Sequence, residues 1–351
     1  MVLTMLKEVP NNQHMNMSLR QVARRAGVSL GTVSNVINHP ELVSPAKREA
    51  VLKVLKESDF KHGMPKIKST SVAFKTLGIM IPTLTNPFYV DMSNGFQAEA
   101  AATGYGVLIC SMDEDKEMQE FYASLLLERN TAGVLVSPID QRDKYLDKLA
   151  SRDIPVVLHG PKQTSRDMCS ITGNHFHGGE MGVQHLYDLG HRSIAWVTLT
   201  DRFPQIVERE AGVVSAAERL GMQLKMICIS KINAAQGESA VDKILELDTQ
   251  PTAVFCANDY TAIGVICGLS ARGIKTPDDI SVLGYDGISS LSSSILPLST
   301  ISQPVEQLGR QAAKFLIEEI TSSDNHTHKN VAFEPELIAR ATTARPRLRL
   351  V

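Results

Sequence analysis

From Leu77 onward the chain alternates short apolar runs with longer stretches of helical periodicity, and this alternation restricts the fold more than any other feature of the sequence. The first apolar runs are TLGIMIP, GYGVLIC, AGVLVSP and IPVVLHG, and their continuous hydrophobicity is typical of buried parallel strands. Helices are expected between them near residues 88–103, 115–129 and 142–151. Because parallel strands are joined by right-handed helical crossovers, the pattern predicts an α/β fold.

The same pattern continues in SIAWVTL, KMICIS, TAVFCAN and ISVLGYD. About nine strands over roughly 265 residues predict two doubly wound lobes, with a boundary near residue 160. Ligands of open α/β sheets bind beyond the carboxyl ends of the strands, so the residues at those ends are the candidate ligand contacts.

The charge of the chain is distributed unevenly, although its net charge is only −2. Residues 1–75 hold 12 Lys and Arg against 5 Asp and Glu, which gives this segment +7 and leaves −9 on the rest. A basic segment on an acidic body suggests a polyanionic partner for the segment alone. The alternative is a solvated lysine-rich surface without such a partner.

The basic segment contains SLRQVARRAGVSLGTVSNVIN, which predicts two short helices joined by a glycine turn. Ser18 followed three residues later by Gln21 forms a capping box at the start of the first helix. Gly27 suits the left-handed position that ends a helix, and Ser29 is a good N-cap for the next one.

A third helix is expected from Ser44-Pro45 to about Glu57, because a cap followed by proline is a helix start signal. Three short helices with this turn describe a helix-turn-helix unit, although a three-helix bundle with another role has the same pattern. In such a unit the second helix enters the major groove and presents its N-terminal residues to the bases. Here these residues are Leu30, Gly31, Thr32, Ser34 and Asn35.

The run LRQVARRAGVSLGTVSNVIN closely resembles the DNA-binding head of the lac/galactose repressor family, and the resemblance extends from Ser18 to about Thr343. Two residues depart from the family pattern. Gln21 replaces an aspartate but still completes the cap, and Gly31 offers no side chain to a base. The full set of residues expected to contact DNA is Ser18, Ser29, Leu30, Gly31, Thr32, Ser34, Asn35, Asn38, Lys66 and Ile67.

The resemblance weakens in the linker, residues 63–76. The family has a hinge helix there that inserts a leucine into the minor groove, where this chain has Ser69 and a proline at Pro65. A short helix with Ile67 as the apolar wedge and Lys66 on a phosphate remains possible, and a flexible basic linker is the alternative.

The resemblance implies an all-α helix-turn-helix head followed by an α/β core like that of the periplasmic binding proteins, with two doubly wound parallel-sheet lobes. The expected segments are a disordered extension (1–17), the head (18–62), the linker (63–76), the two-lobe domain (77–343) and a basic tail (344–351). The N-lobe is expected to comprise about 77–160 plus 287–303, and the C-lobe about 161–286 plus 304–343, with crossings near 160–170 and 285–305.

The effector is expected to bind between the lobes. Phe88, Tyr89 and Asp140 follow predicted strands, and the two aromatic rings are suited to stacking on a sugar or a base. The resemblance adds Arg209, Asn258, Asp259 and Asp286, in which an Asp–Arg pair would bind ligand hydroxyls through charge-assisted hydrogen bonds. Gln303 completes the expected set of effector contacts. For each charged residue the alternative is a local salt bridge, and for the aromatic residues it is core packing.

Metal and cofactor chemistry is not expected. His175, His177, His185 and His191 lack a supporting Cys/Asp shell and are interpreted as surface or cap residues. Gly173 stands where the family usually has an aspartate, so a ligand or cap role of that carboxylate is absent.

The cellular location is expected to be cytoplasmic. Five widely spaced cysteines without a Cys-x-x-Cys pair fit reduced thiols, and no apolar run approaches the ~20 residues of a membrane span or forms a signal peptide.

The sequence therefore predicts a ligand-controlled transcriptional regulator, most simply a repressor, that binds a near-palindromic DNA operator as a homodimer. A sugar, nucleoside or related metabolite is the expected effector. The alternatives are a carbohydrate-binding protein without a DNA role and an enzyme that uses the carboxylates Asp140 and Asp286, although no catalytic motif is present.

Overall fold

The structure is a computed structural model that describes residues 19–38, 40–57, 75–112, 115–137, 144–150, 154–161, 167–200, 203–293, 296–322 and 325–347. It divides into two compact units, Met1–Ala73 and Phe74–Val351. The predicted extension and almost all of the predicted linker lie outside the described residues, as do Ser18, Lys66, Ile67 and Asp140.

The first unit holds a small helical head. Its elements are α1 (Leu19–Arg25), α2 (Leu30–Asn38), the 3-10 turn η1 (Pro40–Leu42) and α3 (Pro45–Glu57). One apolar cluster joins the three α-helices and consists of Val22, Ala23, Val33, Val36, Val51 and Val54. Gly27 has a φ of 65°, so the left-handed turn predicted between the first two helices is confirmed.

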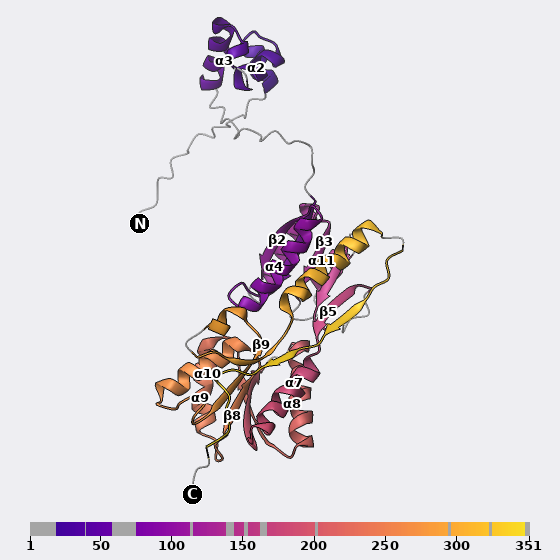
Figure 1. Cartoon of the computed structure of the whole chain (residues 1–351). Helices are drawn as coiled ribbons and strands as arrows, with labels where there is room; N and C mark the ends of the chain where they lie inside the picture. Colours follow the sequence, from indigo (N-terminus) through magenta and orange to yellow (C-terminus); the bar gives the residue numbers. More distant parts are fainter. Residues whose placement is uncertain are drawn as a thin grey trace, which may run out of the picture. The chain divides into compact units, whose positions relative to one another are not determined.

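The second unit contains two lobes, each built on a six-stranded sheet (Figure 1). The N-lobe sheet has the order β11-β5-β4-β3-β1-β2, and all of its strand pairs are parallel. Its strands are β1 (Thr76–Ile81), β2 (Gly106–Ser111), β3 (Gly133–Val136), β4 (Val156–His159), β5 (Cys169–Gly173) and β11 (Asn330–Phe333).

Helices cover both faces of the N-lobe sheet, because successive residues of a strand point to opposite faces. On β1, Leu77, Ile79 and Ile81 join one apolar cluster with α4 and α11, whereas Met80 joins a second cluster with α5 and α6. These helices are α4 (Pro87–Ala102), α5 (Lys116–Glu128), α6 (Lys144–Ala150) and α11 (Val305–Thr321).

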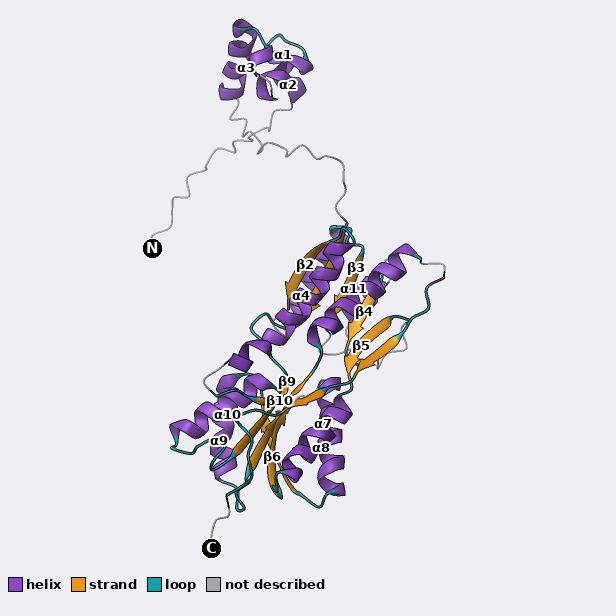
Figure 2. Cartoon of the chain, in the orientation of Figure 1, coloured by secondary structure: helices purple, strands orange, loops and turns teal. Residues whose placement is uncertain are grey.

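The C-lobe sheet has the order β12-β10-β9-β8-β6-β7 and is parallel except for its edge strand β12. The helices form two pairs, α7 with α8 and α9 with α10, on opposite sides of the sheet (Figure 2). The strands are β6 (Ser193–Leu199), β7 (Gln223–Ile229), β8 (Ala253–Cys256), β9 (Ser281–Asp286), β10 (Ser299–Ser302) and β12 (Glu336–Ile338). The helices are α7 (His175–Asp188), α8 (Pro204–Arg219), α9 (Ala234–Leu245), α10 (Asp259–Ala271) and the 3-10 turn η2 (Ser289–Ser293).

The fold class predicted from the sequence is confirmed, but the lobe boundaries were wrong. β5 belongs to the N-lobe sheet although residues 161–286 were assigned to the C-lobe, and β10 belongs to the C-lobe sheet although 287–303 were assigned to the N-lobe. The segment of α11 and β11 packs in the N-lobe, whereas 304–343 were assigned to the C-lobe. The chain therefore crosses between the lobes after β5, after β10 and between β11 and β12.

The sequence also predicted about nine strands, and the described residues form twelve. The short strands β5, β10, β11 and β12 have three to five residues each and mix polar with apolar side chains, so no apolar run marks them. None of the helices in the described ranges is both long and apolar enough to cross a membrane.

Helices α7 and α8 approach each other through glycine. A Cβ atom on Gly179 would lie 2.2 Å from the backbone oxygen of Arg209, and one on Gly212 would lie 1.9 Å from that of Phe176. Both contacts involve backbone, which cannot move without shifting a helix. The two glycines therefore fix the spacing that brings the first turn of α7 beside Arg209.

Replacement of Gly212 by alanine tests this close approach. In an ordinary helix interior Gly→Ala is stabilising by roughly 0.5–1 kcal/mol. Here the added methyl group is expected to destabilise the protein by about 1–3 kcal/mol, because it must push the two helices apart. Urea unfolding of Gly212→Ala and of the control Gly106→Ala, whose Cβ would meet nothing nearer than 3.6 Å, measures the difference. Equal or increased stability of Gly212→Ala would contradict the packing described here.

Candidate functional site

The head presents the N-terminal turn of α2 to solvent. The side chain of Ser29 caps this helix, because its Oγ accepts a hydrogen bond from the backbone N–H of Thr32 at 3.1 Å. Leu30 is 44% exposed although it is apolar, and Gly31, Ser34 and Asn35 are also exposed, whereas Thr32 is half-buried. The opposite side of α2 is the apolar one, where Val33 and Val36 are buried.

This exposed turn offers the chemistry expected of a base-reading helix. An asparagine amide can form two hydrogen bonds with adenine, and an apolar side chain can contact a thymine methyl group. Basic side chains elsewhere in the head can bind phosphates, and the exposed ones in its described part are Arg20, Arg24, Arg25, Lys47, Arg48 and Lys53. Asn38 is the last residue of α2, and its side chain lies outside the described residues.

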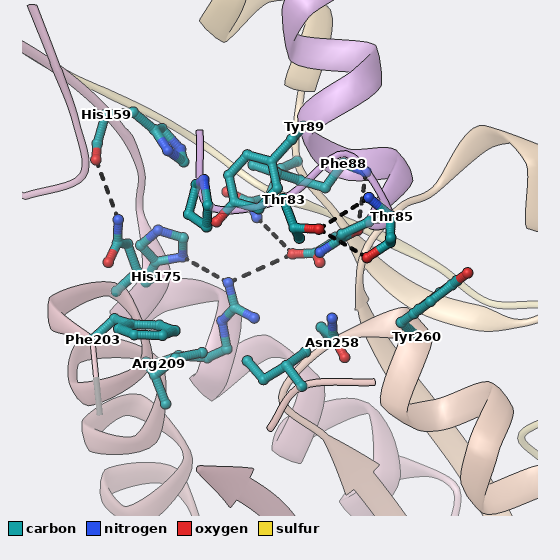
Figure 3. A pocket seen from close by; sticks show the side chains of 17 residues that line it. Thr83, Thr85, Phe88, Tyr89, His159, His175, Phe203, Arg209, Asn258 and Tyr260 are labelled. Atoms are coloured by element: carbon teal, nitrogen blue, oxygen red, sulfur yellow. Dashed lines mark hydrogen bonds and ion pairs between the residues drawn. The ribbon is translucent and has the colours of Figure 1, made fainter. Parts of the chain in front are cut away.

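A second candidate site is a cavity of about 100 Å³ between the two lobes (Figure 3). Side chains from the N-lobe, the C-lobe and the crossover after β10 line it together. The polar and aromatic residues among them are Thr83, Thr85, Asn86, Phe88, Tyr89, His159, His175, Phe203, Gln205, Arg209, Asn258, Tyr260, Asp286 and Gln303.

Arg209 of α8 is the central cation of this pocket and is 4% exposed. Its guanidinium lies 3.7 Å from Oδ1 of Asp286, donates to the backbone oxygen of Ala257 and lies 3.3 Å from Nδ1 of His175. The same group stacks over the ring of Tyr285, with 3.3 Å between the guanidinium carbon and the ring centroid. A buried charge needs such partners, so the arginine is held in one orientation toward the cavity.

Asp286 ends β9 in an unusual backbone conformation, with a φ of 119°. A residue with a side chain rarely adopts such a φ, and outliers of this kind concentrate at functional sites. The amide of Gln303 donates to Oδ1 of Asp286 at 3.0 Å and so fixes the carboxylate from the crossover. Burial raises the pKa of Asp286 to about 6, against the opposing effects of Arg209 and Gln303.

The absence of a side chain at Gly173 makes room for the contact between Gln303 and Asp286. A Cβ atom there would lie 2.5 Å from Oε1 of Gln303 and 3.5 Å from the His175 ring. The glycine at this position, which departs from the family pattern, therefore leaves the space into which Gln303 turns to reach Asp286.

Two neutral histidines face the cavity from opposite lobes. Burial lowers the pKa of His159 to about 4. Burial, then the charge of Arg209 and then His159 hold the pKa of His175 well below its usual range. Neutral imidazole carries one donor and one acceptor nitrogen, so each ring can serve either kind of ligand group.

The sequence led us to interpret His175, His177, His185 and His191 as surface or cap residues. This interpretation was wrong for His175 and His191. His175 is 2% exposed and lines the cavity, and His191 is 1% exposed and bonds Thr252 and the backbone oxygen of Ala344. Nothing in the sequence marks the difference, because His175 becomes buried only where α7 packs against Arg209 and Tyr285. His177 is exposed and His185 is half-buried.

The aromatic side chains surround the polar centre. Phe88 and Tyr89 lie at the start of α4 with their ring centroids 5.3 Å apart, and Phe88 lies 5.5 Å from the ring of His159. Phe203 and Tyr260 line the pocket from the C-lobe (Figure 3). The pocket thus combines flat apolar surfaces with a polar centre.

Several polar atoms in the pocket have no hydrogen-bond partner among the described residues, although they are buried. These atoms are His159 Nε2, His175 Nε2, Gln205 Oε1, Arg209 Nε, Asn258 Nδ2 and Gln303 Oε1. Buried polar groups without partners are costly, and a group of them around one cavity marks the place where a polar ligand or water completes the hydrogen bonds.

The structure places six of the eight predicted effector residues in the pocket lining, namely Phe88, Tyr89, Arg209, Asn258, Asp286 and Gln303. Asp259 is not in the lining. Its carboxylate accepts hydrogen bonds from the hydroxyl of Thr300 at 2.6 Å and from the backbone N–H of Ile288 at 2.8 Å, and it thereby ties α10 to the end of β9. Burial and the nearby charge of Asp286 raise its pKa to about 8.

The pocket also contains residues that the sequence did not single out. Gln205 reaches across the lobes and donates to the backbone oxygen of His159 at 3.3 Å. Thr83 and Thr85 lie between the end of β1 and the predicted aromatic pair. Their position after a strand is the sequence signal that could have identified them as pocket residues. Phe203, Gln205 and Ile206 come from the start of α8, which the sequence pattern did not connect with the N-lobe.

Comparison with known proteins finds relatives of both units of the chain. The family of bacterial regulatory proteins, lacI family, matches residues 18–62, and the periplasmic binding protein-like domain matches residues 183–343. The HTH-type transcriptional repressor PurR of Vibrio atlanticus (strain LGP32) is 31% identical over 330 residues, which cover 93% of this chain and 98% of that protein. PurR of Vibrio parahaemolyticus serotype O3:K6 (strain RIMD 2210633) is 32% identical over 332 residues, with 93% and 98% covered.

Solved structures give the same result. A LacI family transcriptional regulator from Enterococcus faecium with bound ribose has a TM-score of 0.72 at 25% identity and covers 78% of this chain and 100% of its own. The lac repressor dimer bound to operator and the anti-inducer ONPF has a TM-score of 0.69 at 25% identity, with 93% and 99% covered. With its helix-turn-helix head and its two-lobe ligand-binding core, the chain belongs to the lacI family of bacterial regulatory proteins, the ligand-responsive transcriptional regulators.

Proposed function

We propose that this regulator represses transcription from a near-palindromic operator, that it binds the operator as a homodimer, and that a small polyhydroxylated molecule in the inter-lobe pocket controls it. A monosaccharide or a nucleoside fits this description. The observation that carries the proposal is the group of unpartnered polar atoms around the Arg209–Asp286 pair, enclosed by aromatic rings.

The donor and acceptor set favours hydroxyl groups as ligand groups. A carboxylate accepts from two hydroxyls, whereas a guanidinium and an amide donate to hydroxyl oxygens, and charge-assisted bonds of this kind are about twice as strong as neutral ones. Phe88 and Phe203 offer apolar faces to a sugar ring or a base. The related Enterococcus faecium regulator was solved with bound ribose, and the regulator CelR, 25% identical to this chain, was solved in complex with cellobiose.

Contacts from both lobes give such a ligand a means of control. The hydrogen bond from Gln205 to the backbone of His159 joins the lobes directly, and Gln303 lies on a crossover and holds Asp286. A ligand that adds contacts to both lobes favours one angle between them. A difference of about 1–3 kcal/mol between two angles is enough to change DNA occupancy 5- to 150-fold.

A dimer is supported by exposed apolar side chains on the N-lobe. Leu108 and Ile109 on the edge strand β2 are 38% and 42% exposed, and Phe121 on α5 is 57% exposed. Apolar groups exposed on an edge strand are typical of association surfaces. Two heads in one dimer would read two half-sites related by a two-fold axis.

Thermal unfolding of the purified protein against pentoses, hexoses and nucleosides tests the effector class. A ligand that binds only the folded state stabilises it by about 2.7 kcal/mol at 100 times its dissociation constant. With the ligand so found, Asp286→Asn is expected to weaken binding 10-fold or more, because charged hydrogen bonds contribute about 1.5–3 kcal/mol. The exposed Asp242→Asn serves as the control and should bind as the unmodified protein does. If no polyhydroxylated ligand stabilises the protein, the effector part of the proposal is wrong.

The affinity for this ligand should depend on pH through Asp286. Its pKa of about 6 in the free protein means that the carboxyl binds a proton as the pH falls below this value and then no longer accepts from two hydroxyls. His159, with a pKa of about 4, and His175 stay neutral across this range. Calorimetry between pH 7.5 and pH 5 should therefore show about a 10-fold loss of affinity for each unit below 6. The dependence should disappear in Asp286→Asn, and its persistence there would assign the titration to another group.

Base reading by α2 is tested with Asn35→Ala. After an operator has been selected from random duplexes, loss of the Asn35 amide should cost about 1–3 kcal/mol of operator affinity and leave binding to unrelated DNA unchanged. Fluorescence anisotropy on both duplexes measures the two affinities. Glu49→Ala on the exposed side of α3 is the control. An equal loss on both duplexes would show that Asn35 contacts only the backbone.

A further inference from the structure

A cluster of side chains of metal-ligating types lies in the N-lobe and shares no residue with either site described above. Cys169 is the first residue of β5, Glu319 lies in the last turn of α11, and His326 and His328 precede β11. One donor atom from each of the four side chains lies within 4.8 Å of all the others. Cys169 and Glu319 are 150 residues apart in sequence, so only the folded lobe brings the four together.

The imidazoles are directed toward the same point. Nε2 of His326 lies 3.3 Å from Sγ of Cys169 and 3.7 Å from Oε2 of Glu319. Nδ1 of His328 lies 3.8 Å from the same sulfur and 3.9 Å from the same oxygen. Each ring thus turns one nitrogen to the sulfur and the carboxylate at once.

These separations agree with the edges of a tetrahedron. With bonds of about 2.3 Å to sulfur and about 2.0–2.2 Å to nitrogen and oxygen, a tetrahedral zinc site has ligand atoms about 3.4–3.6 Å apart. The four separations between a histidine nitrogen and the sulfur or the carboxylate oxygen, which are 3.3, 3.7, 3.8 and 3.9 Å, lie close to these values. A contraction of a few tenths of an ångström would bring these four separations to tetrahedral values, and all four donor atoms already lie within 4.8 Å of one another.

Hydrogen bonding within the cluster does not account for all of its atoms. Oε2 of Glu319 is buried and has no hydrogen-bond partner among the described residues, since both histidine nitrogens lie beyond 3.5 Å from it. The sulfur of Cys169 is also inaccessible to solvent, and the side chain of His326 is only 5% exposed. A buried carboxylate oxygen aimed at a sulfur and two imidazoles is what a cation would satisfy.

Groups next to the cluster also favour the binding of a metal ion. Nε2 of His328, the nitrogen that points away from the cluster, lies 3.8 Å from Oδ2 of Asp167, and carboxylates in this position orient metal-ligating histidines. The backbone N–H of Lys329 donates to Sγ of Cys169 at 3.4 Å, which favours the thiolate that a metal requires.

We propose that Cys169, Glu319, His326 and His328 form a closed site for a divalent transition-metal ion, with zinc as its occupant. One sulfur and two imidazole nitrogens are borderline-soft donors, which suit zinc and exclude magnesium and calcium, whose ligands are oxygens. Four protein ligands fill a tetrahedral ion completely, so the site is structural and has no open position for a substrate.

The ion would join three elements of the N-lobe at one edge of its sheet. It ties the end of α11 to the start of β5 and to the segment that leads into β11, and these two strands pair in parallel from Ser170 and Asn330 onward. Their opposite ends, Gly173 and Phe333, lie directly before two of the lobe crossovers. The metal therefore stabilises the strand pair from which two of the three connections between the lobes begin.

Cobalt binding to the full-length protein tests this site. Tag-free protein is stripped with a chelator, dialysed and titrated with Co²⁺, which reports tetrahedral coordination through its visible d–d absorption and a thiolate ligand through a near-ultraviolet charge-transfer band. One equivalent of cobalt per chain is expected to give both signals, and zinc is expected to displace it. Absence of the tetrahedral spectrum from the unmodified protein would overturn the proposal.

Variants identify the ligands. Cys169→Ser should lose the charge-transfer band, and His328→Asn should weaken cobalt binding more than 10-fold, because even the loss of a residue that only orients a metal ligand typically has this effect. Cys267→Ser, which removes an exposed cysteine on α10, is the matched control and should bind cobalt as before. Circular dichroism checks that each variant is folded, and should Cys169→Ser fail this check, His328→Asn gives the result. An unchanged spectrum in a folded Cys169→Ser or His328→Asn would contradict the assignment.

Discussion

The buried ion pair of Arg209 and Asp286 is the interaction on which the arrangement of the pocket depends. Two charges can be removed from water only if each is paired and hydrogen-bonded, because the desolvation of an isolated ion costs several kcal/mol. The chain meets this requirement with groups from separate elements, namely the Ala257 oxygen, the Tyr285 ring and the Gln303 amide. The demand for these partners explains the glycines at 173, 179 and 212, each of which removes a Cβ that would displace one of the groups or helices involved.

Much of the architecture could be predicted from sequence, because the long strands and the head carry local signals. Continuous apolar runs mark β1, β6 and β9, and the caps at Ser29 and Ser44 together with Gly27 mark the helices of the head. The lobe assignment could not be predicted in the same way. Both lobes use the same strand and helix patterns, so the amphipathic pattern of α11 indicates a helix but not that it packs on α4 instead of on a C-lobe helix.

The candidate sites differ in how many of their residues could be predicted from the sequence. Phe88 follows the loop after β1 and Asp286 ends β9, so both carry a positional signal, and the structure places both in the pocket lining. His175 and Gln205 enter the pocket only through the packing of α7 and α8, a tertiary effect with no local pattern. The cluster of Cys169 with His326 and His328 is harder still, since its members are joined only by the pairing of β5 with β11.

The division of the core into two lobes explains how a small ligand can act on the whole domain. The apolar clusters of the N-lobe and the C-lobe share no residue, so each lobe is packed as a unit and the crossovers are the places where the backbone can change. Two of these crossovers lie at the pocket: His175 follows the first and lines the cavity, and Gln303 on the second bonds Asp286. In the proposed mode of control, a ligand that completes the unpartnered atoms around Asp286 binds beside these two crossovers, and contacts that differ between two lobe angles would favour one of them.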